Sequence, residues 1–186
     1  MATGSGGGRT REPGEMWNAK LKTTTSLDDS GYVLFTVEES NVSKVDKCGA
    51  TDVPYCVNYR STRDPHSFDE PPGVFKTGTQ LGDMGLPVFR EGWAKLKLAI
   101  NNAAIEKGDP IKVAASGGGK VDKYTPAALL TSSAAALGAS VETRFDQLGK
   151  IVGHSEEENV PQGTTLIPGK DKVLVKLSIR AIGIIT

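Results

Sequence analysis

Cysteine is scarce in this chain, with two residues, Cys48 and Cys56, among 186. Small scaffolds stapled by disulfides use several pairs, so that class is excluded, and a chain of this length can bury a core without them. The two thiols could pair across a hairpin, but two reduced, partly buried thiols are the preferred interpretation in a cytoplasm. A zinc site would need the two cysteines, His66 and a fourth ligand, and the spacing of these residues matches no compact metal knuckle. We therefore expect no metal and no cofactor.

An excess of charge of either sign is also missing. Lys and Arg number 22, and so do Asp and Glu, so the formal net charge is zero. Nonspecific binding to nucleic acid needs a basic excess that displaces counterions, and binding to a membrane surface needs a polybasic patch. We expect neither nucleic acid nor a membrane as a partner. A near-neutral surface instead favours a protein that works within an assembly.

Long hydrophobic runs are absent as well. No stretch approaches the roughly 20 apolar residues of a membrane-spanning helix. Residues 1–9 hold no apolar region of the kind that a secretory signal contains. We expect the protein to be made and folded in a cytoplasm.

Groups that could perform catalysis are few, since His66 and His154 are the only histidines. His154 precedes Ser155, but neighbours on a turn rarely face one another as a nucleophile and its base must. Residues 117–120 lack the spacing and the hydroxyl residue of a phosphate-binding loop, so we interpret them as a flexible turn. Residues 156–158, three glutamates, are interpreted as a solvated acidic tip, with a calcium-type cation site as the alternative. The sequence predicts no enzyme.

Glycine and proline are abundant, at 22 and 10 residues, while aromatics make up only 6% of the chain. This composition fits a β architecture with many turns. A short apolar run broken by Cys or Gly and followed by a polar turn occurs twice, at 52–59 and at 148–154. Apolar alternation and β-branched residues predict strands at 31–38, 53–59, 86–90, 93–100, 110–113, 121–124, 141–145, 149–154 and 173–185.

The segment 93–100 shows the alternation most clearly. One face carries Ala94, Leu96, Leu98 and Ile100, and the other carries Trp93, Lys95 and Lys97. This is the pattern of a half-buried strand. The predicted fold is mainly β, a small β-barrel or sandwich with one short Ala-rich helix, an extended N-terminal arm and a long Pro/Gly-rich loop.

One helix is predicted after the strand at 121–124. Thr125 can cap it, Pro126 suits its first position, residues 127–137 are mostly good helix formers, and Gly138 supplies the end. The polar face of this segment is thin. We therefore expect the helix to be packed on nearly every side.

Two segments lack the patterns of regular structure. Residues 1–18 form a Gly-rich arm, which we expect to order only on a neighbouring subunit, through Arg9, Arg11 and Trp17. Residues 61–87 form a Pro/Gly-rich excursion, and loops of that length tend to be functional or to lie against a partner. The predicted organisation is an arm at 1–18 and a single β-rich domain at 19–186.

From Trp93 to about Ile182 the chain resembles the capsid cement, or head-decoration, proteins of tailed phages and archaeal tailed viruses. The matching features are Lys-Gly-Asp-Pro-Ile at 107–111, a short hairpin, a variable Ala-rich insert, Leu-Gly-Lys-Ile-Val-Gly at 148–153 and the apolar strand at 173–177. Residues 1–92 are longer than the simplest members of the family require.

The resemblance implies a non-enzymatic virion protein on the outer capsid surface. Such proteins bridge subunits of the major capsid protein, often as homotrimers, and stabilise the shell against the packed genome. The contact residues we expect for this role are Arg9, Arg11, Trp17, Phe68, Phe75 and Trp93.

Other classes of function remain open. Another virion component, such as a turret base, tail or connector protein, is the nearest alternative. A β-barrel that binds a glycan or nucleic acid would need an exposed aromatic and basic face. The only residues that indicate such a face are Trp93, Lys95 and Lys97. A small hydrolase would need paired carboxylates or a nucleophile with its base, and the sequence supplies no convincing set.

Overall fold

The computed structural model describes residues 14–59, 85–100, 103–158 and 170–179. Within these ranges the chain forms ten strands and one helix. The strands are β1 (Met16–Ala19), β2 (Val33–Glu39), β3 (Val42–Lys47), β4 (Cys56–Asn58), β5 (Leu86–Phe89), β6 (Glu91–Lys97), β7 (Pro110–Val113), β8 (Val121–Lys123), β9 (Ile151–Ser155) and β10 (Lys172–Ser178). The helix is α2 (Ala134–Leu148).

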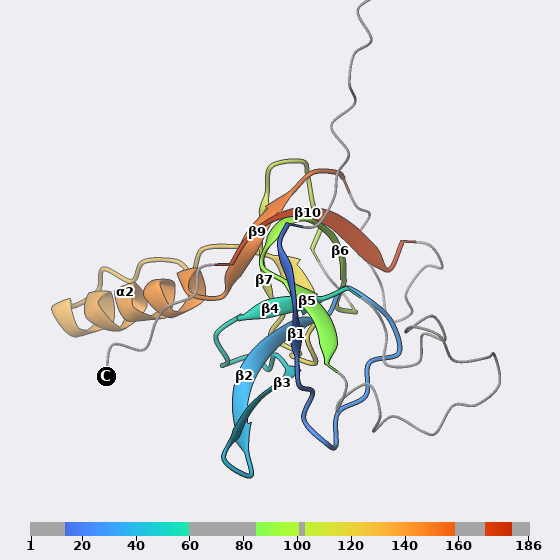
Figure 1. The fold of residues 1–186 in the computed structure, drawn as a ribbon. Coiled ribbons are helices and arrows are strands. Elements are labelled where there is room, and N and C mark those ends of the chain that lie inside the picture. The colour runs from blue at the N-terminus through green and yellow to red at the C-terminus, as the bar shows by residue number, and fades with distance from the viewer. Residues whose placement is uncertain (1–13, 60–84, 101–102, 159–169, 180–186) are drawn as a thin grey trace, which may run out of the picture.

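The strands form two antiparallel sheets of five (Figure 1). The first sheet has the order β1-β5-β4-β2-β3, and the second has the order β6-β10-β9-β7-β8. A single bridge between Leu98 and Val121 brings the two edges of the second sheet together at one point. The sheets are otherwise not closed, so the predicted mainly β fold is confirmed and a sandwich describes it.

The chain passes from one sheet to the other at a sharp corner. β5 ends at Phe89, β6 begins at Glu91, and Arg90 is the one residue between them. Gly92 follows with φ +92°, a left-handed conformation that favours glycine. Strands that switch sheets at a bend in this way form the corners of two-sheet folds.

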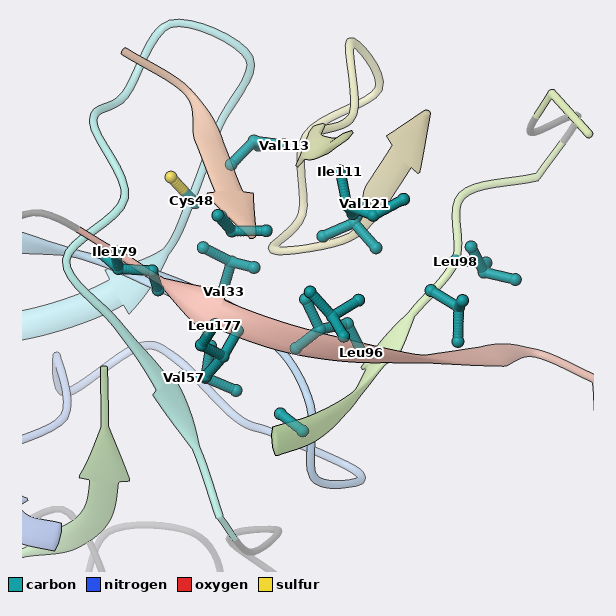
Figure 2. Packing of buried hydrophobic residues seen from close by; sticks show 14 of the residues in the cluster. Val33, Cys48, Val57, Leu96, Leu98, Ile111, Val113, Val121, Leu177 and Ile179 are labelled. Atoms are coloured by element: carbon teal, nitrogen blue, oxygen red, sulfur yellow. The ribbon is translucent and has the colours of Figure 1, made fainter. Parts of the chain in front are cut away.

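The main core lies between the sheets. Figure 2 shows Val33 and Val57 of the first sheet near Leu96 and Leu177 of the second, and all four side chains are buried. Burying a Val or Leu side chain contributes about 1.5–3 kcal/mol relative to leaving it in water. The other buried members of this core are Cys48, Phe89, Ala94, Leu98, Ile105, Ile111, Val113, Val121, Val152, Val173, Val175 and Ile179.

A smaller apolar cluster covers the outer face of the first sheet. Successive residues of a strand point to opposite faces, so Val33 joins the main core while Leu34 joins this second cluster. Leu27 and Tyr32, from the chain before β2, lie over the same face. The centre of the first sheet is therefore buried on both sides, with residues 21–32 as its outer cover.

Gly119 fastens the β7–β8 hairpin to the first sheet. Its N–H donates to the carbonyl oxygen of Cys48, and its own carbonyl accepts from the N–H of Val33, both at 2.8 Å. Gly119 has φ +71°, and a Cβ there would lie 2.8 Å from the carbonyl oxygen of Val33. The position therefore requires glycine. The glycine run that we expected to be a flexible turn is a contact between the sheets.

A cluster of charges also joins the two sheets. Asp29 lies 2.8 Å from the amine of Lys172 in β10 and 3.3 Å from the amine of Lys97 in β6. Burial works to raise the pKa of Asp29, but hydrogen bonds from Lys172 and from the Ser30 amide, with the lysine charges, hold it below its usual value. The carboxylate thus stays ionised where it ties the cover of the first sheet to the second.

Most of the predicted strands are present, but the predictions for residues 125–148 were wrong. The predicted strand at 141–145 is part of α2, and the predicted helix at 125–137 instead begins at Ala134 and continues to Leu148. Ser133, whose hydroxyl accepts from the N–H of Ala136 at 3.1 Å, is the N-cap in place of Thr125. The expectation that the helix is packed on nearly every side is also wrong, because Ser140 is its one buried residue.

Three further outcomes concern single elements. Neither β1 nor β3 was predicted: residues 16–18, expected to order only on a neighbouring subunit, pair with β5 of the same chain, and the turn before β3 places Ser40 and Asn41 at φ 55° and 60°. Ile100 was expected on the buried face of its strand, but 46% of its surface is exposed. Cys48 and Cys56 are both buried free thiols, as preferred from the sequence.

Candidate functional site

The α2 arm, residues 125–148, is the part of the described chain that stands away from the two sheets. Figure 1 shows α2 extending outward from the sheets, with the chain that precedes it running alongside. A helix of 15 residues is about 22 Å long. The arm therefore presents a long surface beyond the body of the protein.

Side chains of α2 hold residues 125–133 against one flank of the helix. The hydroxyl of Ser140 accepts from the N–H of Leu130 at 3.2 Å and donates to the carbonyl of Leu137 at 2.9 Å. The guanidinium Nε of Arg144 donates to the carbonyl of Ala127 at 2.7 Å. These bonds satisfy backbone groups of the extended segment, so the arm is a defined two-part unit.

The neighbouring flank of α2 is apolar and open to solvent. Leu137, Val141, Phe145 and Leu148 follow one another at intervals of four, four and three residues, which places them on one side of a helix. The exposed fractions are 69% for Phe145, 48% for Leu148 and 39% for Leu137. We call these four residues the apolar stripe.

The arm concentrates exposed apolar side chains. Of the ten large hydrophobic residues that are exposed in the described chain, five lie in the arm. They are Leu129, Leu130, Leu137, Phe145 and Leu148. Single exposed apolar residues are ordinary, but a group of them on one element marks an interaction site.

An apolar pocket lies at the base of the arm, where the stripe ends. Its volume is about 490 Å³, and Leu148 belongs both to its wall and to the stripe. The described residues that line it are Pro54, Leu148, Gly149, Ile151, His154, Ser178 and Ile179. The stripe and this pocket form one continuous surface, which we call the arm surface.

The side of α2 away from the stripe is polar. Glu142 and Asp146 are both exposed, and a helical period places them on the opposite side from Leu137 and Leu148. The helix is thus amphipathic, with one flank on residues 125–133, one apolar flank in solvent and one charged flank. Glu142 borders Phe145, three residues on, so a charge change at Asp146 alone is the control that leaves the arm surface intact.

The contact residues predicted from the sequence lie elsewhere or outside the described residues. Trp17 is in β1, where it packs against Tyr55 and Arg90. Trp93 is in β6, with the amine of Lys176 5.5 Å from its ring centre. The remaining four lie in segments outside the described ranges: Arg9, Arg11, Phe68 and Phe75. Neither described tryptophan belongs to the arm surface.

The basic face suggested by Trp93, Lys95 and Lys97 is interrupted at Lys97. The side chain of Lys97 is 13% exposed and is engaged by Asp29 at 3.3 Å and Asp171 at 3.8 Å. Its charge is therefore compensated within the protein. The structure therefore weakens the hypothesis that this strand carries an aromatic and basic binding face.

Ser155 and His154 are not arranged as a nucleophile and its base. They are neighbours in β9, where successive side chains point to opposite faces; Ser155 is buried and His154 is exposed. The Ser155 hydroxyl donates to the backbone carbonyl of Glu157. The residues that the structure describes hold no group of three His, Cys, Asp or Glu side chains that could bind a metal ion.

Among residues 14–59, 85–100, 103–158 and 170–179, no helix is long and apolar enough to cross a membrane.

The fold and the arm surface together define a two-sheet β protein with a projecting helical arm. Comparison with protein-family models, with curated proteins and with solved structures finds no match to this chain.

Proposed function

We propose that this protein is a non-catalytic structural component that attaches to a larger protein assembly through its α2 arm. The observation that carries the proposal is the apolar stripe on a helix that stands outside the body, with Phe145 69% exposed. A monomer gains nothing from holding such side chains in water. A binding surface is the role that fits them.

The energetics favour an assembly with many copies over a single contact. Full burial of a Leu or Phe side chain contributes about 1.5–3 kcal/mol, so the three half-exposed side chains of the apolar stripe, Leu137, Phe145 and Leu148, would contribute roughly 3 kcal/mol. Association itself costs about 4–15 kcal/mol. One arm alone would therefore hold weakly, whereas several arms on one oligomer would bind a repeating surface with high avidity.

The partner we propose is the major capsid protein of a virus, with this protein on the outer surface of the shell. The support is the resemblance of residues 93–182 to capsid cement proteins, together with the zero formal charge and the arm surface. Homotrimers, as the resemblance implies, would supply three arms around one axis. Arg9, Arg11, Phe68 and Phe75 remain candidates for further contacts.

The isolated arm also favours a partner on physical grounds. Helices of about 15 residues are marginal in water unless an apolar face is packed. Within the described ranges, α2 is packed along one flank, through Ser140 and Arg144. Contact between the apolar stripe and a shell subunit would supply the missing packing.

The test is co-sedimentation of the purified protein with empty capsid shells of tailed viruses. The parent protein is expected to pellet with shells in a fixed ratio. The double variant Leu137→Ser with Phe145→Ser should remain in the supernatant, because it removes the centre of the apolar stripe. The matched control, Asp146→Asn, should pellet like the parent because it changes only the polar side.

Two outcomes would contradict this proposal. A parent protein that stays monomeric by light scattering and ignores every shell would refute the structural role. A mass that rises with concentration in the absence of shells, and that the Leu137→Ser and Phe145→Ser changes abolish, would identify a second copy of the chain as the occupant of the arm surface. The capsid partner would then be wrong.

A further inference from the structure

A second hollow lies on the outer face of the first sheet, at the corner between β5 and β6. Its volume is about 400 Å³, and it is lined by Glu15, Trp17, Arg90 and Glu91. Glu15 and Trp17 come from the start of β1, and Arg90 is the corner residue between the sheets. This site is built from other elements than the α2 arm.

The strand pattern explains why Trp17 and Arg90 meet. Leu86 and Val88 belong to the cluster on the outer face, and Arg90, two residues further on, continues to the same side. Trp17 pairs with Val88 across β1 and β5. The guanidinium therefore emerges beside the indole where the apolar cover of the sheet ends.

Two aromatic rings fix the guanidinium of Arg90. Its central carbon lies 4.7 Å from the ring centre of Trp17 and 4.1 Å from that of Tyr55. The two rings meet edge to face, 6.1 Å apart at 81°. Cation–π contacts on both rings hold the group in one place without using its hydrogen-bond donors.

One donor of Arg90 has no acceptor among the described residues. Its Nε is buried and has no hydrogen-bond partner. No ion pair joins Arg90 to Glu15 or Glu91 in the part of the chain that the structure describes, although both line the same hollow. A buried, unpaired N–H is costly, and it is tolerated where a ligand supplies the acceptor.

The mixture of charges selects the chemistry of that ligand. An anion would meet two carboxylates, and a cation would meet the guanidinium. A neutral hydroxyl group suits both, because it accepts from Arg90 and donates to Glu15 or Glu91. Several such hydroxyls on a ring with an apolar face, set against Trp17, would use all four of the described residues that line the hollow.

We infer that this hollow binds a neutral carbohydrate through Arg90, Glu15, Glu91 and Trp17. Small-molecule sites have volumes of about 300–1,000 Å³, so a site near the lower end takes one or two sugar rings. The inference stands apart from the proposed attachment to a shell. A virion component and a cellular protein would present the hollow equally well.

The test follows the indole N–H signal of Trp17 by NMR during titration with neutral sugars. The chain has two tryptophans, and a Trp93→Phe variant assigns the two indole signals. The probes are maltotriose, cellotriose, triacetylchitotriose and lactose, with glucuronate and glucosamine as charged comparisons. At least one neutral sugar is expected to shift the Trp17 signal to saturation at millimolar concentration.

Variants connect such a shift to the proposed groups. Glu15→Gln, at an exposed position, and Arg90→Lys, which keeps the charge but loses the Nε donor, should each weaken binding about tenfold. Glu142→Gln on α2 is the control and should bind like the parent. If Arg90→Lys fails to fold, Glu15→Gln and Glu91→Gln carry the comparison.

Three results would overturn the inference. The first is a Trp17 signal that no neutral sugar moves to saturation. The second is tighter binding of glucuronate or of glucosamine, which would assign the hollow to an anion or a cation. The third is saturable binding that the Glu15, Glu91 and Arg90 variants leave unchanged.

Discussion

Substituting Gly119 by alanine tests how the two sheets are held together. Gly119 lies at φ +71°, and a Cβ would approach the carbonyl oxygen of Val33 to 2.8 Å and the Cβ of Tyr32 to 3.2 Å. Its neighbour Gly118 has nearly the same φ, +69°, but a Cβ there would meet no atom within 4 Å. An alanine would therefore cause similar backbone strain at both positions, but only at Gly119 would its Cβ approach neighbouring atoms too closely.

The expected magnitudes follow from that difference. An L-residue in the left-handed region costs about 1–2 kcal/mol, and the reduced freedom of the unfolded chain returns about 0.4–1 kcal/mol. Gly118→Ala should therefore lower the free energy of unfolding by about 1 kcal/mol or less. Gly119→Ala adds an overpacking cost of about 1–3 kcal/mol against the backbone of β2, so we expect a loss of about 3 kcal/mol.

Urea denaturation of the parent and both variants measures this difference. With a slope of about 2 kcal/mol per molar urea, the midpoint of Gly119→Ala should fall about 1 M below that of Gly118→Ala. The slopes should agree among the three proteins, since the same surface unfolds. Equal midpoints for the two variants would refute the conclusion that Gly119 fastens the hairpin to the first sheet.

Three further predictions concern single groups. Gly153→Ala should cost about 3 kcal/mol or more in thermal unfolding, because a Cβ there would lie 2.2 Å from a backbone oxygen of β10. Hydrogen bonds, first from Lys44, lower the pKa of Glu39 to about 2. Because the pKa of Glu39 is lower in the folded protein than in the unfolded chain, its ionised form stabilises the fold fully at pH values above its usual pKa, and this stabilisation is lost as the pH falls toward 2. Lys44→Met should raise the pKa of Glu39 measured by NMR. Burial raises the pKa of Cys48 and of Cys56 to about 12, so neither thiol should react with a thiol reagent until urea unfolds the protein.

The strands that could be predicted are those in which apolar residues alternate. Leu96 and Leu98 are fully buried, as the pattern in their segment indicated. β3 escaped prediction because its residues are mostly charged or polar and one edge of it is covered by residues 20–22. Ser40 and Asn41 have positive φ values, as in the tight turn of a β-hairpin. Such a turn is the feature that would have predicted β3.

The limits of the helix were predicted wrongly because a single glycine was interpreted as its end. Gly138 suggested an end, yet a glycine inside an exposed helix costs only about 1 kcal/mol and the helix continues through it. Residues 141–145 were interpreted as a strand from their apolar content. Their helical spacing with Leu137 and Leu148 was the signal that defines α2.

The candidate surfaces were the least predictable part. The apolar stripe depends on the true limits of α2, so an error of several residues concealed it. The hollow beside Arg90 depends on the pairing of β1 with β5, which joins residues about 70 positions apart in the chain. Trp17 was predicted as a subunit or capsid contact, whereas its packing against Tyr55 and Arg90 follows only from the sheet topology.

The most direct test of the attachment proposal is amide hydrogen exchange of residues 125–148 in the free protein and in the protein bound to capsid shells. We predict fast exchange in the free arm, because the described residues pack against one flank of α2, and strong protection of α2 in the bound state. Protection that appears elsewhere on binding, with the exchange of α2 unchanged, would contradict the proposal that the arm is the site of attachment.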